Sequence, residues 1–328
     1  LAFLAATITS NVVMVLGLRF KATGVIAANV IANVFACGLG LVLASQSLRG
    51  SFSGPLARAL IRTGVSLLPG TFSFLLLAGV DRILLTQFVS PADLGLYAIA
   101  NKLASMLYVL LGPAWNAWWP MALEMAPQPD APRQYARMSE YFVAGSMLLA
   151  LGLGLFAPEI LGVFTRAAYV PAAPYALALM IYVGPLSFMA QFLFTGLYAR
   201  KRTHLVSLAY LVAAAVNITL NILLNPLIGV WGAVWATVWA GVVLLAIAYA
   251  AGQRALPIPY RWRRIAGLSA VYLGLVTAYL LWPALNTLSF KLGAGLLLAA
   301  AIPAVGIVSR QQVQIALQAL RYRMVHRA

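Results

Sequence analysis

Residues 78–88 read AGVDRILLTQF and place two charged side chains, Asp81 and Arg82, inside an apolar run. The run before them, residues 66–80, reads SLLPGTFSFLLLAGV. About 20 consecutive apolar residues let a helix cross a bilayer, and an ionisable residue within such a segment is costly enough to be a candidate for function. The stretch therefore predicts a membrane-spanning helix that carries a charged site in its second half.

The composition extends this prediction to the whole chain. Of its 328 residues, 63% are hydrophobic and 9% are charged. Soluble domains average roughly 45–50% apolar and about 25% charged residues. Apolar runs of spanning length recur, without the alternating segments of about ten residues that are typical of a transmembrane β-barrel. We predict an all-α polytopic membrane protein with about ten apolar segments, at residues 1–18, 24–46, 64–88, 95–120, 141–164, 173–198, 204–225, 229–252, 265–284 and 289–308.

The net charge of +16 comes largely from basic residues between the apolar segments. From the third segment onward every second joint is basic, as expected for cytoplasmic loops. These joints and the tail carry Arg49, Arg58, Arg62, Arg133, Arg137, Arg200, Lys201, Arg202, Arg254, Arg261, Arg263, Arg264, Arg310, Arg321, Arg323 and Arg327. We interpret this charge as a topology signal that also contacts anionic membrane lipids, and we expect no nucleic-acid partner.

The sequence offers no sign of a cofactor. The single cysteine, Cys37, lies within an apolar run, so we expect neither a disulfide framework nor a metal site. The phosphate-binding pattern GxxxxGK[ST] does not occur, so we expect no nucleotide site.

The first two segments break the alternation, because both ends of segment 24–46 are basic and would face the cytoplasm. An internal repeat suggests a reason. The similar pairs are residues 21–37 with 201–217, at an offset of 180, and residues 36–50 with 240–254, at an offset of 204. The offsets differ by about 24 residues, the length of one span. We expect a span to be missing near residues 36–41 and, because the chain starts with Leu1, its natural start to be missing too.

The third and fourth segments bring charged residues to a similar depth. The third runs outward and ends soon after Asp81 and Arg82, and the fourth returns inward through Lys102. Because the joint is short, we expect these three residues to line one cavity, whose net positive charge suits an anionic group such as a phosphate. Adjacent helical residues point about 100° apart, so Arg82 can face a ligand while Asp81 is held elsewhere, for example by Lys102. The alternative is that these charges fix helix packing and that Lys102 snorkels to the interface.

Polar residues at helical spacing add two weaker candidates. Asn217, Asn221 and Asn225 repeat every four residues on one helix face, a pattern more typical of helix packing than of cavity lining. Asn101 begins a stripe on the fourth segment that continues through Ser105, Tyr108, Gly112 and Trp115. We add Asn101 and Asn217 to the three charged residues as candidates for substrate binding.

Around these residues the chain resembles a known family. Residues 79–107, GVDRILLTQFVSPADLGLYAIANKLASML, are similar to the signature region of polysaccharide flippases of the multidrug/oligosaccharidyl-lipid/polysaccharide exporter superfamily. The stretches APEILGVFTRAAYVPAAPYALALM and NITLNILLNPLIGVWGAVWATVW resemble the next two landmarks in the same order. The likeness covers most of residues 56–252.

The resemblance implies two six-helix lobes around a central cavity, often followed by two further helices. Mapped onto this chain, the regions are a remnant of the first lobe at 1–47, a cytoplasmic inter-lobe loop at 48–63, the second six-helix lobe at 64–252, two additional helices at 253–308 and a basic cytoplasmic tail at 309–328. Compared with the pattern that the resemblance implies, this chain would lack three helices at the start and one more inside.

The resemblance also implies a function. A non-enzymatic transporter of the bacterial inner membrane would flip a lipid-linked oligosaccharide or polysaccharide precursor by alternating access, with its pyrophosphate and sugars facing the charged cavity. Two alternatives stay open: a drug/cation antiporter of the same superfamily, for which Asp81 is the one suitable acid, and an inactive fragment. A membrane glycan polymerase or ligase is disfavoured, because the outward joints are short and almost uncharged.

Overall fold

The computed structural model describes residues 2–17, 20–45 and 53–307, and all regular elements among them are helices. The predicted all-α class is therefore confirmed. The chain divides into two compact units, Leu1–Thr63 and Gly64–Ala328, which are considered separately below.

The first unit contains a helical hairpin. α1 (Ala2–Asn11) continues into a π-helical turn, η1 (Val12–Gly17), and α2 (Lys21–Ala44) packs along α1. Gly24 allows the close approach at the turn, because a Cβ atom there would lie 3.0 Å from the Met14 carbonyl oxygen. α2 is uninterrupted where we expect a span to be missing. A helix fused from two ends would look the same, so that expectation stays a prediction.

The second unit is a helical bundle with short connections. Its elements are α3 (Gly54–Leu85, which begins in the first unit), α4 (Pro91–Met125), α5 (Ala131–Leu155), α6 (Ala157–Phe164), η2 (Ala167–Ala172), α7 (Ala173–Ile181), η3 (Tyr182–Leu186), α8 (Ser187–Ala199), α9 (Thr203–Ile228), α10 (Val230–Ala255), α11 (Trp262–Leu281), η4 (Pro283–Leu285) and α12 (Leu288–Ala304). η3 is a π-helix, whereas η2 and η4 are 3₁₀ turns.

Helices extend beyond the apolar segments at several places. α3 already includes residues 54–63, which we expected to form a loop. These residues read GPLARALIRT, with a proline in the first turn and several good helix formers, so the helix continues beyond the apolar run. Residues 48–52 of that loop and the predicted tail at 309–328 lie outside the described residues.

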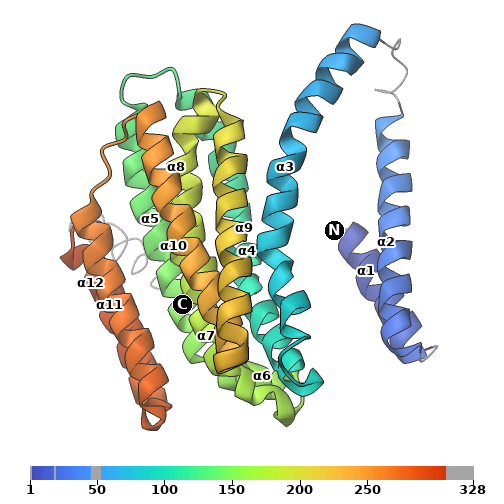
Figure 1. Ribbon diagram of the computed structural model, residues 1–328, viewed down its shortest axis with the longest axis vertical. Coiled ribbons are helices and arrows are strands. Elements are labelled where there is room, and N and C mark those ends of the chain that lie inside the picture. The colour runs from blue at the N-terminus through green and yellow to red at the C-terminus, as the bar shows by residue number, and fades with distance from the viewer. Residues whose placement is uncertain (1, 18–19, 46–52, 308–328) are drawn as a thin grey trace, which may run out of the picture. The chain divides into compact units, whose positions relative to one another are not determined.

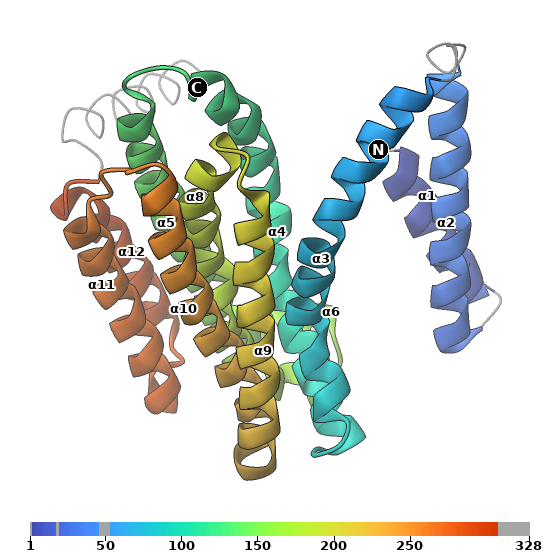
Figure 2. The ribbon, with the colours of Figure 1, turned by 45° about the horizontal axis from the view of Figure 1, so that its top comes forward.

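The centre of the second unit is the continuous helical stretch formed by α7, η3 and α8. This stretch is almost entirely buried and packs against α4, α5 and α10. α9 packs on α10, and the final pair, α11 and α12, packs on α5 (Figures 1 and 2). The core of the bundle therefore lies around α7 and α8.

A π-helical segment interrupts the central stretch at Pro185. Proline cannot donate the backbone hydrogen bond of a regular α-helix, and a π turn is one way to accommodate it. Opposite this segment, Gly241 of α10 lets the ring of Tyr182 approach, because a Cβ atom at Gly241 would lie 2.3 Å from that ring. The close contact fixes Tyr182 at the edge of a polar cavity described below.

Length and composition identify a multi-pass membrane protein. Among the described residues, seven helical stretches are long and apolar enough to cross a bilayer: α2, α4, α5, the stretch from η2 to α8, α9, α10 and α11. α12 is apolar but has 17 residues. The predicted number of segments, about ten, stays a prediction.

The basic start of α3 and the basic joints of the second unit should face the cytoplasm. Cysteines placed singly at Arg58, Arg202 and Arg261 in a Cys37→Ser background should react with a membrane-impermeant thiol reagent from the cytoplasmic side only, because positively charged loops are retained there. A cysteine at Arg166, in a joint predicted to face outward, serves as the control and should react from outside. Outside labelling at any of the first three positions would contradict the topology.

Candidate functional site

Asp81 lies near the end of α3 and is buried, with 2% of its surface exposed. Its carboxylate accepts three hydrogen bonds of 2.8 Å from three other helices. Tyr97 Oη of α4 and Thr237 Oγ1 of α10 donate to Oδ2, and Asn221 Nδ2 of α9 donates to Oδ1. None of the ion pairs among the described residues includes Asp81. Asp81 is therefore the point at which four helices meet, held by neutral donors alone.

The asparagines of α9 form a hydrogen-bonded ladder next to this carboxylate. Asn221 Nδ2 also donates to the Asn217 carbonyl oxygen (2.9 Å), and Asn225 Nδ2 donates to Asn221 Oδ1 (3.0 Å). Asn217 Nδ2 donates across to Thr237 Oγ1 at 3.4 Å. All three asparagines are buried. The ladder joins α9 to α10 and orients the Asn221 donor toward Asp81.

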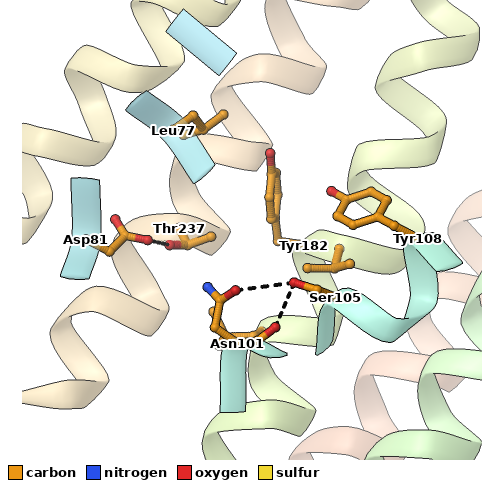
Figure 3. A pocket seen from close by; sticks show the side chains of 9 residues that line it. Leu77, Asp81, Asn101, Ser105, Tyr108, Tyr182 and Thr237 are labelled. Atoms are coloured by element: carbon orange, nitrogen blue, oxygen red, sulfur yellow. Dashed lines mark hydrogen bonds between the residues drawn. The ribbon is translucent and has the colours of Figure 1, made fainter. Parts of the chain in front are cut away.

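A small polar cavity lies beside Asp81 (Figure 3). Its volume is about 70 Å³, and its lining residues are Leu77, Asp81, Asn101, Ser105, Tyr108, Leu179, Tyr182, Val183 and Thr237. A water molecule needs roughly 10–15 Å³ of such volume, whereas pockets for larger ligands measure about 300–1,000 Å³. The cavity can hold a few waters or a small cation, and it is too small for a saccharide. Asn217 is not among its lining residues, so the predicted contact of Asn217 with a substrate stays a prediction.

Arg82 is exposed, and none of the ion pairs among the described residues joins it to the neighbouring Asp81. Its Nη2 donates to Asn101 Oδ1 at 3.2 Å. Ser105 Oγ donates to the Asn101 carbonyl oxygen (2.7 Å) and lies 3.3 Å from Asn101 Oδ1. Asn101 therefore connects the exposed guanidinium to the cavity wall. Arg82 itself is not among the lining residues, so the expectation that it shares this cavity with Asp81 is wrong.

Lys102 does not join this group. It lines a separate pocket between α4 and α6, and the partners of Asp81 are Tyr97, Asn221 and Thr237. The expectation that Lys102 shares the cavity and holds Asp81 is therefore wrong. Because Asn101 faces the cavity, its neighbour Lys102 is turned by about 100° onto another face of α4.

Two further charge clusters were not anticipated. Lys291 of α12 is buried and forms an ion pair with Glu159 of α6. Glu140 of α5 is also buried, with Arg264 Nη1 at 3.6 Å and Arg261 Nε at 3.9 Å from its carboxylate oxygens. Charges near the ends of apolar segments were the available signal, but the sequence does not show which of them turn inward. Both clusters attach the final helix pair and the joint that precedes it to the bundle.

Comparison with known proteins adds one finding. Residues 1–118 match the model of a family described as polysaccharide biosynthesis protein. The matched part includes α3 and most of α4, and with them Asp81, Arg82, Asn101 and Lys102. It covers about a third of the 328 residues, so the similarity concerns this part of the chain. Neither a curated protein nor a solved structure matches the chain.

Proposed function

We propose that this protein moves a polysaccharide precursor linked to an anionic lipid across the bacterial inner membrane. The observation that carries the proposal is the match of residues 1–118 to a polysaccharide biosynthesis family. The multi-pass helical fold supports a transporter, since such a precursor must cross the bilayer. In this proposal the protein itself performs no chemical step, and access to the substrate alternates between the two sides.

Arg82 is the residue that we assign to the anionic part of the substrate. Its guanidinium is exposed and uses one donor on Asn101, so other donors are free to bind a phosphate through two parallel hydrogen bonds. The saccharide must bind outside the small cavity, which has room for a few waters only. Asp81 then acts by fixing the helix that presents Arg82.

The drug/cation antiporter is the second candidate. Asp81 supports it, because this buried carboxylate has three neutral donors and no cationic partner among the described residues. A proton or a small cation could enter the adjacent cavity and pair with it. The same arrangement could couple an ion gradient to the movement of a saccharide, so Asp81 alone does not separate the two functions.

Replacing Arg82 by alanine should lower polysaccharide export per protein molecule by more than about tenfold, because a charge-assisted phosphate contact is lost. Arg82→Lys should retain part of the export, since an ammonium is a point charge without the guanidinium fork. The measurement is surface polysaccharide, divided by the protein detected in the membrane, in cells whose only copy of the natural gene carries the variant.

Arg166→Ala is the matched control, because it removes an exposed arginine from a joint at the same predicted side. It should leave export per molecule near the wild-type value. Normal export per molecule in Arg82→Ala would reject the role of Arg82. Loss of cation-driven dye efflux together with unchanged polysaccharide would favour the antiporter.

A further inference from the structure

The pocket that contains Lys102 differs from the polar cavity in size and chemistry. Its volume is about 440 Å³, and it lies between the first half of α4 and the short helix α6. Apart from Lys102 and Thr165, its lining is apolar: Ile99, Leu103, Met106, Ile160, Leu161 and Phe164. The pocket thus combines one cationic side chain with a long apolar surface.

Lys102 is available to a ligand. Its side chain is exposed, and it belongs to none of the ion pairs found among the described residues. Thr165, the other polar residue of the pocket, donates its hydroxyl to the Leu161 carbonyl oxygen at 2.6 Å. The ammonium of Lys102 is therefore the main hydrogen-bond donor that the lining offers.

The apolar wall is open to the surroundings of the helix bundle. Phe164 is 82% exposed and Met106 is 45% exposed, so the pocket is continuous with a surface that an acyl chain can reach. α6 lies at the end of the bundle where α5 finishes (Figure 1), which places the pocket near one membrane interface. A lysine at such a place can direct its ammonium to the head-group level while its stem follows apolar surface.

We propose that this pocket binds one phospholipid with a singly charged anionic head group, such as phosphatidylglycerol. The phosphate contacts Lys102, and one acyl chain lies along the apolar residues of α4 and α6. A lipid-linked saccharide fits less well, because sugars need hydrogen-bond partners spread over several ring hydroxyls and the lining supplies one free polar group, the Lys102 ammonium. The inference concerns a bound lipid rather than the transported molecule, so it goes beyond the proposed function and can fail independently of it.

Native mass spectrometry of the purified, delipidated protein tests this site. Titration with phosphatidylglycerol should show one lipid bound per protein. Phosphatidylcholine at the same concentrations should bind more weakly. Lys102→Ala should weaken phosphatidylglycerol binding by about tenfold, through loss of a charge-assisted hydrogen bond, and Lys102→Arg should preserve it. Met106→Trp should also weaken binding with Lys102 intact, because the larger side chain fills the pocket.

Arg254→Ala is the matched control, since it removes an exposed basic residue of α10 far along the chain from this pocket. It should bind phosphatidylglycerol like the wild type, and circular dichroism should show equal helix content in all variants. Equal binding of the two lipids, unchanged binding in Lys102→Ala or in Met106→Trp, or binding of an isoprenyl phosphate in place of phosphatidylglycerol would each overturn the proposal.

Discussion

Asp81→Ala should lower the free energy of unfolding by about 3 kcal/mol, because each buried donor left without a partner costs about 1–3 kcal/mol. The substitution leaves the hydroxyls of Tyr97 and Thr237 and the amide of Asn221 without the carboxylate to which they all donate. Unfolding of the full chain in mixed micelles with increasing dodecyl sulfate, followed by circular dichroism, gives the value.

Asp81→Asn removes the negative charge but can keep the hydrogen bonds, so it tests the two contributions separately. Asparagine has nearly the same shape, and the hydroxyls of Tyr97 and Thr237 can rotate to accept from its amide. We expect a loss of about 1 kcal/mol in unfolding free energy, and a smaller loss of export than in Arg82→Ala. Glu124→Ala, at an exposed position of α4, is the control and should change stability by less than about 0.5 kcal/mol. If Asp81→Ala were as mild as this control, the network would not hold the four helices together.

Glu159→Ala should cause the second large loss in the free energy of unfolding, although about half of the Glu159 side chain is exposed. Its partner Lys291 has a side chain only 1% exposed, and its ammonium lies 5.3 Å from the centre of the Phe156 ring. Without Glu159 the buried cation keeps aromatic contacts but no counter-charge. Removing one partner of a buried pair typically costs about 3–5 kcal/mol, so we expect a loss of about 3 kcal/mol in the same unfolding measurement.

Lys291→Met tests the reason for that effect. Methionine removes the buried charge and keeps much of the volume, so the cost should be within about 1.5 kcal/mol and below that of Glu159→Ala. Glu124→Ala removes an exposed acid of α4 and is the matched control. The opposite order, with Lys291→Met the more damaging change, would indicate that aromatic contact rather than ion pairing holds α12 in place.

A charged position within an apolar run could be recognised from the sequence, whereas its direction around the helix axis could not. Asp81 and Arg82 were recognised as unusual because they interrupt an apolar run, and adjacent residues must diverge on a helix, as they do here. The same rule applies to Asn101 and Lys102, and only one of them can face the cavity. The sequence contains no signal for which one, because that depends on how α4 rotates against its neighbours.

The partners of Asp81 show a second limit. Thr237 and Asn221 lie 156 and 140 residues from it along the chain, so their contacts depend on tertiary packing. Their types were visible as polar positions in apolar segments. The asparagine ladder was favoured as a packing element, in agreement with the bonds from Asn217 to Thr237 of α10 and from Asn221 to Asp81 of α3. Lys291 was missed because a lysine at the start of an apolar segment usually faces the interface.

The π turn at Pro185 sets the phase of α8. A π turn contains one residue more than an α turn, and one residue corresponds to a rotation of about 100°. Phe188 and Phe192, which follow the turn, reach the rings of Trp115 and Trp118 on α4 because of that surplus residue. Deletion of one residue from this turn would leave every aromatic residue in the chain. It would nevertheless rotate α8 by about 100°, so that its aromatic face no longer contacts α4.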